Sequence, residues 1–310
     1  MRRNHLPRFR RSAVTTLGAV LLATTFAAAA VAQESKTAVP PNPPAQLAVS
    51  PGRFEVEVSD RPSVQALKLM NFSDRDVTVK VSVVPWDLDE NSRVRELETT
   101  EETLDQAMVF NPREFTVSAR SEQTVRFSIR PRMRPAAGEH RAMLYFTEVP
   151  HEAVAGQLQV LFKVGVAVYA YAGEISRVAE LGEVAVRSTE QVFNAVFDIE
   201  SRGNAHVRMA GQYAIWPAEQ FPGIDLVEPF EDIDRIDFRA PEPVLLAGHL
   251  PGTPVLPGTE RQLILAAAHS LPAGDYVLSA VGTLGDREIR RAVAFEVPRA
   301  GAPIVAGQQD

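Results

Sequence analysis

The 310-residue chain contains no cysteine. Disulfide bridges, thiolate metal sites and thiol catalysis are therefore excluded, and the chain must be held together by its buried core. The sequence also lacks the Gly-x-Ser-x-Gly elbow, a glycine-rich phosphate loop with lysine, His-Glu-x-x-His and Ser-x-x-Lys. We therefore expect a protein that is not an enzyme and that uses no cofactor.

Metal-binding residue types are present but scattered. The six histidines show no metal-ligand spacing, so we expect solvated or structural roles for them. A run of acidic residues lacks the glycine and the alternating oxygen ligands of a calcium loop, which favours a solvated loop. Trp86 and Trp216 are interpreted as core residues rather than a carbohydrate platform. The residues of this acidic run are Glu228, Glu231, Asp232, Asp234 and Asp237. We expect neither a metal site nor a small-molecule substrate.

A clustered basic face is also missing. The formal net charge is -7, which argues against nucleic acid as a partner, because binding phosphates requires grouped lysine and arginine.

The amino terminus has the pattern of a secretory signal peptide over residues 1–32. Five arginines precede an uncharged apolar run, which ends in Ala30-Val31-Ala32, a small-x-small cleavage pattern. A membrane anchor is the alternative, since about 20 apolar residues can span a bilayer. Much of the run is alanine and threonine, so we favour cleavage. The remaining chain would have 27 basic and 39 acidic residues and would reside in the periplasm.

Beyond residue 32, the pattern predicts an all-β protein. A Pro-rich linker (33–46) precedes segments in which apolar and polar residues alternate, as in half-buried strands. We expect two tandem immunoglobulin-like β-sandwich domains. Their predicted limits are 47–172 and 182–298, joined by a hinge (173–181) and followed by a flexible tail (299–310). The second domain contains an insertion, 216–252.

The two halves repeat short motifs in the same order. Asn71 and Asn204 each follow a strand pattern, and Gly138 and Gly274 each precede one. The separation from Asn71 to Gly138 is similar to that from Asn204 to Gly274, which indicates an internal duplication.

One segment, from Leu158 to about Tyr171, is predicted to be a long strand. Its even-numbered residues form a continuous apolar face that includes Leu158, Val160, Phe162 and Val164. Two interpretations are open. The strand is either an ordinary central strand, or an edge strand that completes the sheet of another protein.

The first domain resembles the periplasmic pilus-assembly chaperones, the PapD-like family, as a divergent member. The resemblance covers about residues 47–172. It depends on the order and spacing of several short matches: Val49-Ser50-Pro51-x-Arg53, Leu67-x-Leu69-x-Asn71, Phe115-x-Val117, Thr124-Val125-Arg126, Gly138 to Phe146, and the strand from Leu158.

This resemblance implies donor-strand complementation. Leu158, Val160, Phe162 and Val164 would fill the open groove of a pilus or surface-fibre subunit, with or without an outer-membrane usher. Family members also anchor the carboxylate of the subunit with two basic residues. Those positions fall on Glu55 and Ala167 here, so Arg53 and Lys163 are candidate substitutes. The alternative is an immunoglobulin-like envelope protein, binding or structural, without a subunit client.

Overall fold

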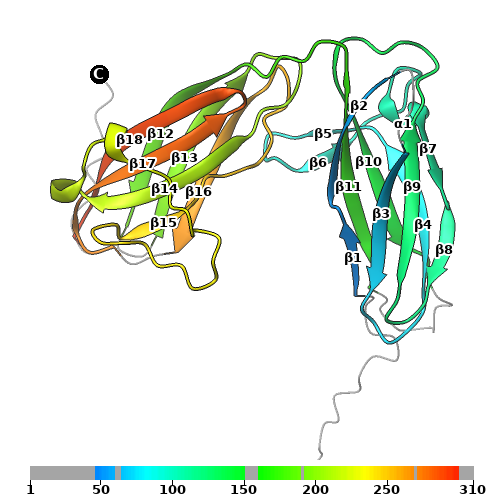
Figure 1. Cartoon of the computed structure of the whole chain (residues 1–310), viewed down its shortest axis with the longest axis horizontal. Coiled ribbons are helices and arrows are strands. Elements are labelled where there is room, and N and C mark those ends of the chain that lie inside the picture. Colours follow the sequence, from blue (N-terminus) through cyan, green and yellow to red (C-terminus); the bar gives the residue numbers. More distant parts are fainter. Residues whose placement is uncertain (1–45, 60–63, 151–159, 190–191, 269–270, 300–310) are drawn as a thin grey trace, which may run out of the picture. The chain divides into compact units, whose positions relative to one another are not determined.

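The computed structural model describes residues 46–59, 64–150, 160–189, 192–268 and 271–299 (Figure 1). The expected signal peptide, all of the expected linker except Gln46, and residues 300–310 of the expected tail lie outside the described residues. All described elements belong to one compact unit, Asn42–Asp310.

The first half of this unit is a β-sandwich. One sheet has the strand order β1-β3-β9-β7, and the facing sheet has the order β2-β11-β10-β4-β8. A two-stranded hairpin, β5–β6, and one short helix complete it. The elements are β1 (Leu47–Ser50), β2 (Arg53–Glu57), β3 (Val64–Asn71), β4 (Val77–Val84), β5 (Trp86–Leu88), β6 (Val94–Glu96), α1 (Leu104–Ala107), β7 (Met108–Asn111), β8 (Glu114–Val117), β9 (Glu122–Ile129), β10 (Gly138–Glu148) and β11 (Lys163–Ala172).

The core of the first sandwich follows directly from the alternation in the sequence. Val77, Val79 and Val81 on β4 point inward and are at most 4% exposed, because successive side chains of a strand point to opposite faces. Phe127 on β9 and Phe146 on β10 meet them from the two sheets and are fully buried. Each such side chain stabilises the fold by about 1.5–3 kcal/mol relative to an exposed one.

The second half is a second sandwich, so the predicted fold class is confirmed. Its sheets have the orders β12-β13-β16 and β15-β14-β17-β18. β12 begins at Ala179, inside the expected hinge, so the connection between the sandwiches is shorter than predicted. The strands are β12 (Ala179–Ser188), β13 (Val192–Ser201), β14 (Met209–Pro217), β15 (Leu246–His249), β16 (Glu260–Ala268), β17 (Gly274–Leu284) and β18 (Arg287–Val297).

The predicted insertion forms an ordered layer on the second sandwich. It contains two 3-10 helices, η1 (Ala218–Gln220) and η2 (Ile224–Leu226), and also β15, which pairs with β14. The side chain of Gln212 holds the backbone of Phe230 at both its N–H (2.6 Å) and its carbonyl (2.9 Å). Arg290 donates to the carbonyl of Val227 at 2.6 Å. The acidic residues named above are all exposed, as expected for a solvated surface.

Both tryptophans are buried, which confirms their predicted core role. Trp86 is 3% exposed and Trp216 is 9% exposed. Trp216 lies in a small apolar cluster under the insertion and donates from its ring nitrogen to Ser279 Oγ at 2.9 Å.

The two sandwiches share the pairing order of their central strands, whereas β2 and β7 of the first have no counterpart among the described strands of the second. β4, β10 and β11 are neighbours in the first, and β14, β17 and β18 are neighbours in the second. Gly138 and Gly274 begin the corresponding strands β10 and β17. Asn71 and Asn204 both hold backbone groups with their side chains: Asn71 binds the carbonyl of Arg75 (2.8 Å), and Asn204 binds the N–H of Ser176 (2.8 Å).

None of the helices in the described part of the chain is long and apolar enough to cross a membrane.

Candidate functional site

β11 carries the segment that the sequence singles out, and part of its edge is open. β10 pairs with β11 along its whole length, whereas β2 pairs with it only from Ala167 to Tyr171. Within the described residues, Lys163–Val166 are therefore paired on one side only. We call Lys163–Val166 the open edge. Its free backbone groups are able to pair with an additional strand.

The strand is shorter than predicted. β11 begins at Lys163 rather than at Leu158, and Val160, Leu161 and Phe162 lie ahead of it in irregular structure. Leu158 lies outside the described residues. Residues 160–162 do not belong to a strand. Among the described residues, the backbone pairing of β10 with this segment ends at the hydrogen bond from the N–H of Glu148 to the carbonyl of Phe162.

The apolar face of this segment changes gradually from buried to exposed. Val166 and Val168 are completely buried in the core of the first sandwich, so this part is not available to a partner. Val164 and Phe162 are half-buried, and Val160 is 59% exposed. The expected open face is thus confined to its amino-terminal end.

Glu148 fixes the backbone at Phe162. One of its carboxylate oxygens accepts the N–H of Phe162 at 3.1 Å, and its own N–H donates to the carbonyl of Phe162 at 2.8 Å. The other oxygen pairs with Arg75 Nη2 at 2.6 Å, and the carboxylate is 1% exposed. The sequence analysis missed Glu148, since an acid at the end of an alternating strand normally indicates a solvated position.

Lys163 is held at the beginning of the open edge by two neighbours. Its ammonium group lies 3.1 Å from Glu96 Oε1 and 3.9 Å from the centre of the Tyr145 ring. Gly165 follows, and a Cβ there would lie 2.7 Å from Met143 Sδ. Side chains of β10 thus cover the backbone of β11 on the face opposite to Val164 and Val166.

Arg53, the second candidate anchor, lies on β2 opposite Ala167. Lys163 is four residues away along β11, about 13 Å at the usual rise of a strand, so the register does not bring the two cations together. Arg53 instead pairs with Glu55 at 3.3 Å. Glu55 also accepts a hydrogen bond from the Tyr171 hydroxyl at 3.0 Å. Burial, the largest cause, raises the pKa of Tyr171, so this hydroxyl stays protonated and donates.

Arg208 is a further cation beside β11 that the sequence analysis missed. Its Nη2 donates to the Tyr169 hydroxyl at 3.2 Å, and its Nη1 donates to the carbonyl of Gly252 at 2.7 Å. Burial is the main cause that lowers the pKa of Arg208, and the nearby positive charge of Arg53 lowers it further. Because Arg208 follows a turn in the second half of the chain, no local pattern associates it with β11.

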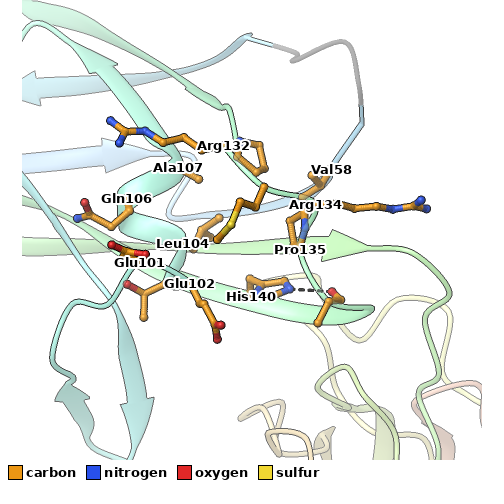
Figure 2. Close-up of a pocket in the computed structure, with 14 residues that line it drawn as sticks. Val58, Glu101, Glu102, Leu104, Gln106, Ala107, Arg132, Arg134, Pro135 and His140 are labelled. Atoms are coloured by element: carbon orange, nitrogen blue, oxygen red, sulfur yellow. Dashed lines mark hydrogen bonds between the residues drawn. The ribbon is translucent and has the colours of Figure 1, made fainter.

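A separate hollow lies at the end of the first sandwich, beside α1 (Figure 2). It has a volume of about 650 Å³ and is lined by apolar side chains such as Leu104 and Met133. The Nε2 of His140 lies 3.0 Å from the carbonyl oxygen of Ala136, and Arg134 extends away from the hollow. The labelled polar groups do not converge on one point. Among the described residues there is also no group of three or more acids and histidines placed to hold a metal ion.

No family model matches the chain, and no curated protein matches it in sequence.

Several solved structures are similar to the chain, and they include chaperones whose descriptions name fimbriae, pili or a pilin. The class 5 fimbriae chaperone CfaA is 10% identical, with a TM-score of 0.42 over 81% of this chain and 99% of that chain. The CsuC–CsuE chaperone–tip adhesion subunit complex of Acinetobacter baumannii is 13% identical, with a TM-score of 0.41 over 82% and 99%. The structure of Salmonella enterica SafA pilin in complex with the SafB chaperone is 12% identical, with a TM-score of 0.38 over 81% of this chain and 96% of that chain.

At identities of 9–13%, this likeness concerns the fold alone. The three similarities extend over 81–82% of this chain.

Proposed function

We propose that the chain is a chaperone-like protein of the periplasm, which assists the folding and assembly of pilus or other surface-fibre subunits by donating a strand. The observation that supports this most directly is the open edge, Lys163–Val166, with an apolar face that emerges from the core just ahead of it. Its partners would be proteins, namely the subunits, with or without an outer-membrane usher. No nucleic acid, small-molecule substrate, metal or cofactor takes part.

In this mechanism, residues 158–162 extend β11 when a subunit binds. Leu158, Val160, Phe162 and Val164 enter the groove of the subunit, and the free backbone groups of the open edge pair with a strand of it. Burying each of these side chains contributes about 1.5–3 kcal/mol before the cost of ordering the segment. Phe162, already held by Glu148, gives the segment a fixed starting point, which lowers that cost.

Arg53 and Lys163 are the proposed anchors for an acidic group of the subunit. Each is now paired with a carboxylate, Glu55 and Glu96 respectively, and the four side chains are 39–50% exposed. Such surface pairs contribute only about 0–1 kcal/mol, so a carboxylate of the partner can replace them at little cost. Because the two cations are well separated, they would contact different parts of the partner.

The test is complex formation with a small exported β-rich protein encoded beside this chain. Both are co-expressed, and a tag on the chain recovers the complex. We expect a 1:1 complex in which the backbone amides of the open edge exchange hydrogen more slowly than in the free chain. The double variant V160D/F162D should lose the complex and remain folded. Any loss in the free energy of unfolding should arise mainly at Phe162, which is half-buried, and little at Val160, which is exposed.

A matched control is V109D. Val109 on β7 is 54% exposed, close to the 59% of Val160, but lies on the other sheet. It should leave the complex intact. Equal recovery of the partner with V160D/F162D and with the parent chain would reject strand donation.

The second candidate is an immunoglobulin-like envelope protein that binds or supports another structure without a subunit client. The complete burial of Val166 and Val168 favours it, because most of the apolar face of β11 belongs to an ordinary sandwich core. Under this alternative, no neighbouring β-rich protein would depend on residues 160–162.

A further inference from the structure

A chain of buried polar side chains connects β10 with Arg208 through a single histidine. The carboxylate of Glu139 accepts a hydrogen bond from the backbone N–H of His206 at 2.9 Å, and it also contacts the ring nitrogen Nδ1 of His206. The other ring nitrogen, Nε2, lies 3.2 Å from Nε of Arg208. Arg208 in turn donates to the Tyr169 hydroxyl on β11. The side chains of Glu139 and His206 are 0% and 4% exposed, so water does not provide substitute partners.

These contacts determine the protonation state of His206. A guanidinium group is always protonated, so Arg208 Nε is a donor and His206 Nε2 must accept with a lone pair. The ring proton is then on Nδ1, where it is donated to Glu139. All the contacts can be formed at once only when His206 is neutral in this tautomer.

We propose that His206 is a pH-sensitive latch, which holds Arg208 against β11 while it is neutral and releases Arg208 when it is protonated. Protonation places an N–H on Nε2, directly opposite the N–H of Arg208, and sets two positive charges beside each other. The contact with Glu139 becomes an ion pair and is strengthened. Arg208 is therefore the group that moves.

The surrounding charges favour release of Arg208 rather than of His206. Arg141 on β10 binds the second oxygen of Glu139 at 3.0 Å and keeps this carboxylate in place. The Tyr169 ring lies against the imidazole, with 4.3 Å between the ring centres. On β2, the positive charge of Arg53 acts on Arg208 and opposes its charge, whereas Glu55 partly compensates.

The consequence for β11 rests on the proposed function, whereas the latch itself does not. Released, Arg208 would add a mobile cation to the outer face of β2 and β11, where Arg53 already lies. An acidic group of a bound partner would then meet more positive charge in mildly acidic surroundings than at neutral pH.

The latch is tested in the free mature chain without any partner. Trp86 lies edge-on to Tyr169, with ring centres 5.6 Å apart, so its fluorescence reports on this cluster. In a W216F background Trp86 is the only tryptophan, since the chain has two. We expect a reversible change in its emission when the pH is lowered from about 8 to about 5.

Two substitutions at residue 206 separate the two states. In H206Q, the side-chain oxygen can take the place of Nε2 and accept from Arg208, so the emission should stay at the pH 8 value. In H206N, the shorter amide can donate to Glu139 but does not reach Arg208, so the emission should stay at the pH 5 value. His249, an exposed histidine paired with Asp234 at 2.9 Å, provides the matched control. H249N should keep the full transition.

A second measurement does not depend on the W216F background. Nitrogen-15 NMR of the histidine rings in the unaltered chain should show His206 as the Nδ1–H tautomer at pH 8. An Nε2–H tautomer at pH 8, or a transition that persists in both H206Q and H206N, would overturn the latch. If the fluorescence transition and the tautomer of His206 are as expected but the chain binds no subunit, the result would count against the proposed function alone.

Discussion

At the scale of single residues, two buried carboxylates organise the ends of β10, and one of them, Glu148, holds the backbone of Phe162 just ahead of β11. Glu148 and Glu139 lie near the two ends of β10, and each accepts hydrogen bonds from backbone and side-chain donors. A buried acid without such partners would be strongly destabilising, because burial penalises the charged form. Each of the two is therefore expected to stabilise its surroundings only as part of its complete set of partners.

Replacing Glu148 by alanine should destabilise the fold and free the backbone at Phe162. The change leaves Arg75 without its carboxylate and Phe162 without its acceptor, so we expect a loss of about 2–3 kcal/mol. Urea unfolding measures the loss, and hydrogen exchange measures the opening at Phe162. Glu122, whose pair with Lys68 is half-exposed, is the control: E122A should cost less than about 1 kcal/mol. A similar cost for both variants would contradict the role of Glu148.

Replacing Glu139 by glutamine should change how stability depends on pH. Burial opposes ionisation of Glu139, but the hydrogen bonds from His206, together with the positive charge of His206 when it is protonated, outweigh it and lower the pKa of the carboxyl group. A lowered pKa stabilises the folded state above the unfolded value of about 4.3, and this contribution is lost as pH falls through the folded pKa. E139Q should therefore be less stable at pH 7 and lose less stability below about pH 4 than the parent. Urea unfolding at several pH values measures both effects, and parallel curves for the two proteins would contradict the assignment.

At the scale of elements, strand pairing explains which positions tolerate side chains. Gly211 on β14 lies opposite Gly282 on β17, and the two backbones approach closely at this point. A Cβ on Gly282 would lie 2.0 Å from the carbonyl oxygen of Ala210, which is a backbone atom and cannot rotate away. The same sheet must therefore open locally if residue 282 is enlarged.

We expect G282A to cost about 2–4 kcal/mol, because the β14–β17 pairing in the middle of a sheet has to shift. Thermal or urea unfolding measures the loss. G252A is the matched control, since a Cβ on Gly252 would have its nearest neighbour at 3.8 Å, an ordinary contact. Equal stabilities of the two variants would show that the backbones are not in close contact.

At the scale of the whole molecule, the absence of cysteine leaves the apolar cores to hold the fold together. The two sandwiches each have their own apolar cluster, so the predicted export would not depend on disulfide formation. The expected cleavage after Ala32 would leave the Pro-rich linker as the new amino terminus.

Mass spectrometry of the chain recovered from the periplasm should therefore give a mass that begins at Gln33. The pattern of small residues at 30 and 32 is the physical reason, because the signal peptidase accepts only small side chains there. An A32R variant should stay in the membrane fraction with residues 1–32 attached. A full-length chain recovered in the soluble fraction would contradict the signal-peptide prediction.

Alternation alone was sufficient to predict two β-sandwiches, because a strand with one buried face must repeat its apolar residues at every second position. The repeated motifs around Asn71 and Asn204 likewise predict a shared strand order. The open edge was predicted less well. Alternation from Leu158 to Phe162 continues that of Val164 to Val168 without a break, yet β11 begins at Lys163, so that Val160 and Phe162 lie ahead of it. Leu158 lies outside the described residues.

The sequence by itself determined the fold class, the absence of thiol chemistry and the buried faces of the strands, since each follows from local composition or period. Only the tertiary structure decided where β11 begins, that Val166 and Val168 face the core of their own sandwich, and that Arg53 and Lys163 lie apart. It also brought Glu139, His206, Arg208 and Tyr169 together from separate strands and turns. The reason is that pairing and burial depend on residues far apart in the chain, whose register no local pattern specifies.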